Sequence, residues 1–317
     1  QHMKTNFEGK KSTGLVLLDI QAAFDTVWHE ALIYKMIKSG FPPFLTAITY
    51  NFLKNRKFYV YVGSVKSNCQ AIVAGVPQGS VLGPILYNIF TSDFPRIENC
   101  TSSIFADDTA LYSSAAKPQE VVHSLQSGLN TLETYFHKWK IKLNAGKTQA
   151  MFFTRRRKTT YLPSSNLSLC GQQVPWCDSV KYLGIILDKT LTYKLHIDNT
   201  INKINVLTKV LYTFINRRSK LSLDNKLLIY KVIFQAIILY GAPLWYKAAK
   251  CYINKLQISQ NKLLKMIYNL PWCFPTHLLH DISEMQSIED KSVALAEKFY
   301  ESCSYSENPL IRQLKGD

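Results

Sequence analysis

The stretch Ile104-Phe105-Ala106-Asp107-Asp108-Thr109-Ala110-Leu111-Tyr112 places two adjacent aspartates between apolar and β-branched residues. Such flanks are typical of strands, and Asp tolerates turn geometry, so the stretch predicts a short hairpin with the acidic pair at its turn. Neighbouring carboxylates repel each other, and burying them is costly unless a positive charge compensates. Magnesium, which prefers hard oxygen ligands, would neutralise the pair. A solvated acidic turn is the alternative, and the rest of the chain must decide.

Composition points to a polyanionic partner. The chain has 317 residues, 47% of them hydrophobic, which is enough for one elaborate domain or two. Its formal net charge is +16, although only 19% of residues are charged. Residues 191–280 carry thirteen Lys or Arg against two acids. Since no apolar run approaches the roughly 20 residues of a spanning helix, nucleic acid is favoured over a membrane as the partner.

The cysteines and histidines do not suggest a metal centre. Seven cysteines lack the CxxC spacing of zinc sites, and seven histidines are scattered along the chain. We therefore expect reduced thiols in a reducing, intracellular compartment.

The first part of the chain mixes strand and helix patterns. The apolar run Leu15-Val16-Leu17-Leu18 predicts a buried strand that ends at Asp19. Helices are expected at 25–39, 44–55, 81–94 and 121–143, strands at 58–63, 149–154 and 180–188, a strand pair around Gly171-Gln172, and a Gly/Pro-rich loop at 74–80. This pattern predicts an α+β domain whose antiparallel sheet is backed by the helices near 25–39, 81–94 and 121–143.

From about Lys194 the pattern becomes helical. Helices are expected at 197–214, at 222–240 with Ser222 as N-cap, at 253–270 and at 288–302. The domain boundary is accordingly predicted near 190, which divides the chain into 1–190 and 191–317.

The acidic residues suggest a chemistry. Nucleotidyl transfer uses two metal ions roughly 3.5–4 Å apart, and these need carboxylates from separate strands. Asp19, at the end of an apolar strand, is the expected third partner of Asp107 and Asp108. The segment Gly146-Lys147-Thr148 is not a phosphate-binding P-loop, because that motif requires Gly at position 141, where Ile141 stands.

Five motifs in order carry a family resemblance. They are the segments Leu18–His29, Gly75–Pro84, Phe105-Ala106-Asp107-Asp108, Leu143-Asn144-Ala145-Gly146-Lys147-Thr148 and Tyr182-Leu183-Gly184. Together they resemble the four palm motifs and the primer grip of reverse transcriptases from non-LTR retrotransposons, particularly jockey-like insect elements. The resemblance covers about residues 12–190 and implies a polymerase palm followed by an all-helical, thumb-like region.

The resemblance also implies roles for single residues. Asp19, Asp107 and Asp108, with the Ile20 carbonyl, would bind two Mg²⁺ ions, with Mn²⁺ as a substitute. The expected nucleotide-binding residues are Ala23, Phe24, Pro77, Gln78 and Gly79, with Phe24 excluding a 2′-hydroxyl; an ordinary core Phe is the alternative. Lys147 would donate a proton to pyrophosphate. Tyr182, Leu183 and Gly184 would position the primer. Arg155-Arg156-Arg157-Lys158 would contact template backbone, or it is a solvated charge run.

The implied function is RNA-directed DNA polymerase activity, which adds dNTPs to a DNA primer on an RNA template. Only 18 residues precede Asp19, so most of the fingers and the endonuclease domain are expected in a longer polyprotein, with target-primed integration in the nucleus. A catalytically inactive nucleic-acid-binding remnant is the alternative. A two-metal nuclease is a third, but it gives no reason for the loop at 75–80 or for Phe24.

Overall fold

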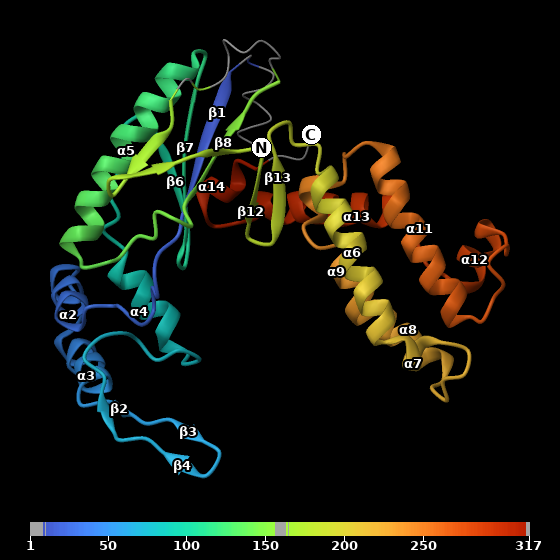
Figure 1. Ribbon diagram of the computed structural model, residues 1–317, viewed down its shortest axis with the longest axis horizontal. Coiled ribbons are helices and arrows are strands. Elements are labelled where there is room, and N and C mark those ends of the chain that lie inside the picture. The colour runs from blue at the N-terminus through green and yellow to red at the C-terminus, as the bar shows by residue number, and fades with distance from the viewer. Residues whose placement is uncertain (1–8, 10, 156–162, 164, 315–317) are drawn as a thin grey trace. The chain divides into compact units, whose positions relative to one another are not determined.

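The sheet at the centre of the first part of the chain is built around β1 (Ser12–Leu18) (Figure 1). The computed structural model describes residues 9, 11–155, 163 and 165–314. The sheet has the order β11-β8-β1-β7-β6, formed by β6 (Thr101–Phe105), β7 (Asp108–Ala115), β8 (Gln149–Phe153) and β11 (Trp176–Cys177) beside β1. All neighbours pair antiparallel except β11 with β8. The predicted α+β class with an antiparallel sheet is confirmed.

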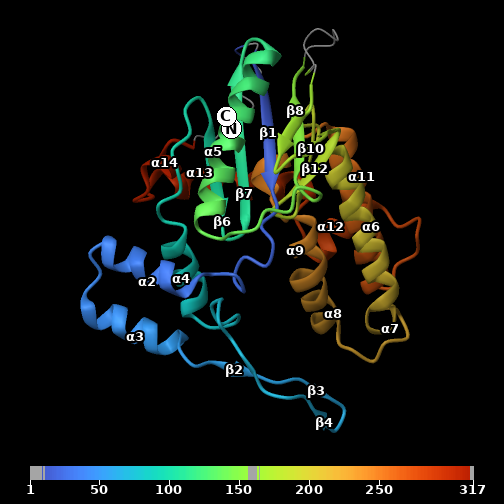
Figure 2. The same cartoon turned by 60° about the vertical axis from the view of Figure 1, so that its left-hand side comes forward.

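Helix α5 (Pro118–Lys138) covers one face of this sheet (Figure 2). Its Val121 and Leu125 are fully buried and lie over Gly14 of β1. A Cβ atom at Gly14 would stand 2.6 Å from Leu125 Cδ1 and 2.7 Å from Val121 Cγ1, so only glycine allows the helix to come this close. The prediction that the helix near 121–143 backs the sheet is therefore confirmed.

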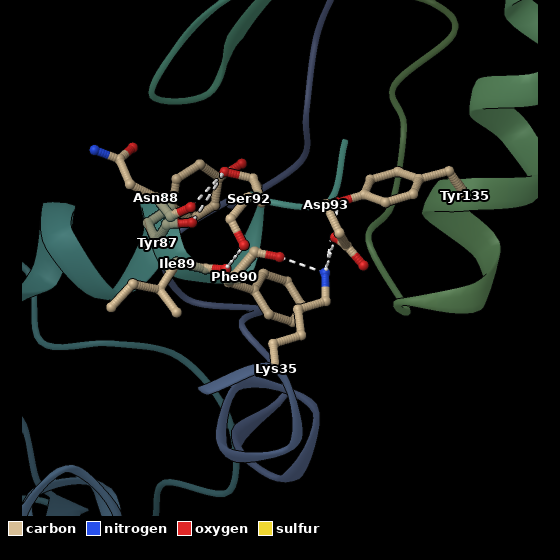
Figure 3. Close-up of polar contacts among 9 residues, drawn as sticks. Lys35, Tyr87, Asn88, Ile89, Phe90, Ser92, Asp93 and Tyr135 are labelled. Atoms are coloured by element: carbon tan, nitrogen blue, oxygen red, sulfur yellow. Dashed lines mark hydrogen bonds and ion pairs between the residues drawn. The ribbon is translucent and has the colours of Figure 1, made fainter. Parts of the chain in front are cut away.

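The other two helices predicted behind the sheet pack against each other. Helix α2 (His29–Lys38) contacts both α3 (Pro43–Leu53) and α4 (Leu82–Phe90). Lys35 of α2, only 2% exposed, donates hydrogen bonds to the Phe90 carbonyl and to Asp93, and Tyr135 of α5 donates to the same carboxylate at 2.9 Å (Figure 3). Burial lowers the pKa of Lys35 even though Asp93 opposes the shift. This network ties α2, α4 and α5 together.

The remaining elements of this part are short strands. They are β2 (Lys57–Phe58), β3 (Tyr61–Val62), β4 (Val65–Lys66) and β5 (Gln70–Ala71), with β9 (Leu167–Leu169) and β10 (Gln172–Val174) as a separate hairpin. β2 pairs with β5 and β3 with β4, so residues 57–71 form a two-stranded ribbon.

The chain divides into two compact units between Val180 and Lys181, earlier than the boundary near 190 expected from sequence. The division falls within β12 (Ser179–Tyr182), which forms a hairpin with β13 (Ile185–Asp188). Ile185 is buried in the hydrophobic core of the second unit, so the hairpin belongs mainly with the segment that follows it.

Apart from this hairpin, the regular structure of the described second unit is helical. Its elements are α6 (Lys194–Val210), α7 (Tyr212–Ile215), α8 (Leu223–Ile229), a π-helical turn η2 (Tyr230–Gln235), α9 (Ala236–Ile238), α10 (Ala242–Trp245), α11 (Lys250–Ile267), α12 (Thr276–Ser283), α13 (Ile288–Ser304) and α14 (Pro309–Arg312). The helix expected at 222–240 is thus interrupted by η2. Ser222 caps α8 as predicted, accepting a hydrogen bond from the Asn225 N–H. Within the described residues, no helix has the length and apolarity needed to cross a bilayer.

Candidate active site

The acidic pair lies at the turn of the β6–β7 hairpin. Phe105 pairs with Asp108, which leaves Ala106 and Asp107 as the two turn residues, and Ala106 takes a positive φ of 53°. Asp108 is the first residue of β7. The hairpin therefore has the form expected from the sequence.

The sheet register brings Asp19 to this hairpin. β1 runs antiparallel to β7, and its last residue, Leu18, pairs with Thr109. Asp19 follows Leu18 and Asp108 precedes Thr109, so the two aspartates are neighbours at the ends of adjacent strands. Partial burial and the charges of Asp107 and Asp19 raise the pKa of Asp108. Three carboxylates thus share one electrostatic environment.

The turn that contains Lys147 is bonded to the backbone of Asp19. The Asn144 N–H donates to the Asp19 carbonyl at 2.8 Å, and the Asp19 N–H donates to the Thr148 hydroxyl at 3.4 Å. Lys147 itself is exposed. The fourth motif contains Asn144 and Thr148, but the sequence predicted no role for them. Nothing in the local sequence indicates a hydrogen-bond partner, here Asp19, that lies more than a hundred residues away.

The same contact orients the Ile20 carbonyl. Ile20 forms an antiparallel bridge with Leu143, and the hydrogen bonds around it are made by Asp19 and Gln21. In such a pair the bridging residue's own N–H and C=O point away from its partner. The Ile20 carbonyl is therefore directed away from Leu143.

The predicted nucleotide-binding segments are joined by main-chain hydrogen bonds. The Val76 N–H donates to the Phe24 carbonyl and the Gly75 N–H to the Val27 carbonyl, both at 2.8 Å. A Cβ at Gly75 would lie 2.6 Å from the Asp25 carbonyl oxygen, and the φ of Gly75 is +88°. Only glycine permits this approach. Ala23 is buried next to Phe24, while Gln78 and Gly79 are exposed and Pro77 is partly buried.

The side chains of Asp25 and His29, for which the sequence predicted no role, hold this loop. The Gln78 amide donates to both carboxylate oxygens of Asp25, at 2.9 and 3.0 Å. His29 Nε2 lies 2.8 Å from the Gly75 carbonyl oxygen. Asp25 and His29 both belong to the segment that follows Asp19, and neither contact could be predicted from local sequence.

Phe24 lies against Tyr87 of α4, with ring centroids 4.9 Å apart. Tyr87 is 1% exposed, and its hydroxyl has no hydrogen-bond partner. Burial and the charge of Asp107 raise the pKa of this hydroxyl, so it remains protonated. An orphaned donor in the field of Asp107 is unusual in a folded protein.

The residue types fit a divalent cation, although the side chains are not gathered around one. Carboxylate oxygens that repel each other, beside a main-chain carbonyl, are hard donors of the kind Mg²⁺ takes. Among the residues that the structure describes, however, no three His, Cys, Asp or Glu side chains form a group ready to hold an ion.

The residues expected to position a primer lie in the second unit. Leu183 and Gly184 are the turn residues between β12 and β13, with φ of 45° and 80°. The Tyr240 hydroxyl donates to the Leu183 carbonyl at 2.7 Å, and a Cβ at Gly184 would stand 3.0 Å from the Tyr240 ring. Tyr240 therefore supports the turn after Tyr182. Of the basic run expected to contact template, Arg156, Arg157 and Lys158 lie outside the described residues.

Comparison with known proteins now gives the family. The family model described as "Reverse transcriptase (RNA-dependent DNA polymerase)" matches residues 1–187. The chain belongs to the reverse transcriptase family. The resemblance inferred from the five motifs is confirmed.

Relatives of this reverse transcriptase chain come from mobile elements. "RNA-directed DNA polymerase from mobile element jockey" of Drosophila melanogaster is 36% identical over 99% of this chain and 35% of its own length. "Probable RNA-directed DNA polymerase from transposon BS" of the same species is 33% identical over 92% of this chain and 33% of its own length. The chain thus spans about a third of the length of the curated relatives it matches.

Among solved structures, telomerase from Candida tropicalis in complex with a TWJ fragment of telomeric RNA overlays with a TM-score of 0.40 and 9% identity. The overlay covers 89% of this chain and 51% of that one. A likeness at this level supports no conclusion about this chain.

Proposed function

We propose that this chain is the catalytic part of an RNA-directed DNA polymerase, which adds dNTPs to a DNA primer on an RNA template. The observation that carries the proposal is the adjacency of Asp19 and Asp108 across β1 and β7, with Asp107 beside them. Family membership supports the same conclusion.

The metal ligands in this proposal are Asp19, Asp107, Asp108 and the Ile20 carbonyl. When bound, two Mg²⁺ ions (or Mn²⁺) would activate the primer hydroxyl and hold the triphosphate. The chain keeps these ligands in register through the β1–β7 pairing and the Asn144–Asp19 hydrogen bond. Lys147, on the turn bonded to Asp19, would donate a proton to the leaving pyrophosphate.

The loop at 75–80 and the segment at 22–27 would form the nucleotide pocket. The side chain of Phe24, backed by Tyr87, would leave no room for a 2′-hydroxyl, so deoxynucleotides are preferred. Ala23, Pro77 and Gly79 would line the same pocket. Gln78, held by Asp25, would contact the incoming nucleotide.

The nucleic acid would be held largely through its phosphates. In the second unit, residues 191–280 carry thirteen basic residues against two acids, and Tyr182, Leu183 and Gly184 would position the primer end. Binding should therefore weaken as salt increases. Further domains of a longer polyprotein, the remaining fingers and an endonuclease, would act with this chain. An intracellular site of action, in the nucleus, fits target-primed integration.

A primer-extension assay tests the proposal. The parent chain should extend a DNA primer on an RNA template with dNTPs and Mg²⁺, and Asp108→Asn should abolish extension. Glu30→Gln is the matched control, since it neutralises an exposed carboxylate of the same unit that lies outside the cluster. Equal extension by the parent and Asp108→Asn would refute the catalytic role.

A nucleic-acid-binding chain without turnover is the second candidate. The observation that favours it is that no three acidic or other ligating side chains of the described residues are gathered for an ion. In that case the parent would bind template and primer with the affinity of Asp108→Asn, and neither would extend the primer.

A further inference from the structure

The ribbon at residues 57–71 extends away from α3, with β3 and β4 at its tip (Figures 1 and 2). Tyr61 pairs with Lys66 and Val62 with Val65 around the turn Gly63-Ser64. The Val60 N–H donates to the Ser67 hydroxyl and the Ser67 N–H to the Val60 carbonyl, both at 2.9 Å. Hydrogen bonds therefore define the ribbon beyond its short strands.

The two faces of the ribbon tip differ in chemistry. Residues directly opposite each other share a face, so Tyr61 and Lys66 lie on one side and Val62 and Val65 on the other. Tyr59 joins the first side, because its ring centroid is 5.4 Å from that of Tyr61 and Lys66 Nζ lies 3.7 Å from its centroid. We call Tyr59, Tyr61 and Lys66 the aromatic face. Val60, Val62 and Val65 are the valine face.

The aromatic face is open to solvent. Tyr59 is 47% exposed and Tyr61 is 61% exposed, although large aromatic side chains usually bury most of their area. Contiguous exposed apolar surface on a folded protein generally marks an interaction site. The ribbon contributes no residue to the buried core of its unit, so packing does not explain these tyrosines.

The charge around the ribbon has one sign. Residues 31–92 contain no Asp or Glu, while Lys54, Arg56, Lys57 and Lys66 lie on the ribbon or at its base. Glu30 lines a cleft at the base together with Arg56 and Lys57. Cations that outnumber the acids beside them, next to exposed rings, complement a strand that offers phosphates and unpaired bases.

We propose that the aromatic face of the ribbon binds single-stranded nucleic acid. Bases would stack on Tyr59 and Tyr61, while Lys66, with Lys57 and Arg56 nearer the base, would neutralise phosphates. The inference rests on the proposed function in one respect: the bound nucleic acid is taken to be the unpaired part of the template. The binding itself requires no turnover.

The experiment measures the affinity of the full chain for a fluorescently labelled single-stranded RNA by anisotropy. Stacking contributes about 1–3 kcal/mol per base, so Tyr59→Ala with Tyr61→Ala should raise the Kd at least about 10-fold. Phenylalanine at both positions keeps the rings and should keep the affinity. Lys66→Gln should reduce the slope of log Kd against log salt by about 0.7, the value for one phosphate of a single strand.

The valine face supplies the matched control. Val60→Thr with Val62→Thr changes the same ribbon on its other side, and the Kd for RNA should stay at the parent value. Because the substituted ribbon side chains are exposed, the ribbon variants should all melt at the temperature of the parent. Asp108→Asn should retain RNA affinity while losing extension, which separates this inference from the proposed catalytic function.

Three results would overturn the inference. The first is a double tyrosine-to-alanine variant that binds RNA as tightly as the parent. The second is an equal loss of affinity in the valine-face variant, which would indicate a general effect of disturbing the ribbon. The third is an equal dependence on the tyrosines for a fully paired duplex, because paired bases cannot stack on them.

Discussion

Neutralising Asp108 should stabilise the protein while it abolishes activity. Partial burial disfavours the ionised form of Asp108, and the like charges of Asp107 and Asp19 add to this cost. Asp108→Asn removes the charge but keeps the size of the side chain. In the absence of divalent cations, we therefore expect the variant to unfold at a higher temperature than the parent.

The magnitude follows from the register. Residues opposite each other on antiparallel strands have Cβ atoms about 4.5–5.5 Å apart. Because Asp108 is exposed over most of its side chain despite its partial burial, a water-like dielectric applies, and two unit charges about 5 Å apart then repel by about 0.8 kcal/mol. Allowing for Asp107 and for screening by salt, the variant should gain about 1 kcal/mol. For a unit of this size that corresponds to about 2–4 °C in melting temperature.

The pH dependence has a definite sign. The pKa of Asp108 is raised in the folded state, so folding binds a proton there more tightly than the unfolded chain does. Stability of the parent should fall as pH rises through the window between the ordinary carboxyl pKa and the raised one. The advantage of Asp108→Asn should therefore be present at neutral pH and disappear in acid, where the parent carboxyl is already protonated.

Thermal unfolding, measured with and without Mg²⁺, checks this prediction. Mg²⁺ should raise the melting temperature of the parent more than that of Asp108→Asn, because the ion relieves a repulsion that the variant lacks. Glu30→Gln is the control and should gain no stability, since Glu30 lines a cleft with Lys54, Arg56 and Lys57. The repulsion among Asp19, Asp107 and Asp108 would be refuted if Asp108→Asn melted below the parent at neutral pH and Mg²⁺ raised both melting temperatures equally.

Two further predictions concern the hydrogen bonds of Asp25 and Asp188. Asp25→Ala and Gln78→Ala should each raise the KM for dNTP about 5-fold, the equivalent of about 1 kcal/mol for exposed hydrogen bonds to a carboxylate. The double variant should have the same KM as Gln78→Ala. If the two effects on KM multiply instead, Asp25 does not act through Gln78. Burial tends to raise the pKa of Asp188, but hydrogen bonds from Thr192, Thr190 and Tyr193 outweigh it and lower the pKa. Asp188→Asn should thus cost the second unit about 1–3 kcal/mol in urea unfolding at neutral pH. That difference should shrink as pH falls below the ordinary carboxyl range towards the lowered pKa, and a pH-independent difference would contradict it.

Much of the fold was accessible from local patterns. The apolar run before Asp19 predicted β1, and the acidic pair between strand-forming residues predicted the β6–β7 hairpin. The helix at 222–240 was expected to be continuous, but η2 interrupts it, and periodicity alone does not reveal a change from α to π hydrogen bonding. The compact units divide at 180/181 and not near 190, because Ile185 belongs to a core assembled from later helices.

The sequence by itself determined the chemical identity of the site: which carboxylates exist, in which motifs, and to which family they belong. Only the tertiary structure decided that Asp19 faces Asp108, that Thr148 bonds the backbone of Asp19, and that Asp25 holds Gln78. The physical reason is that side-chain periodicity reports the local conformation of a segment. Strand register and hydrogen bonds between distant residues depend instead on how the whole core packs.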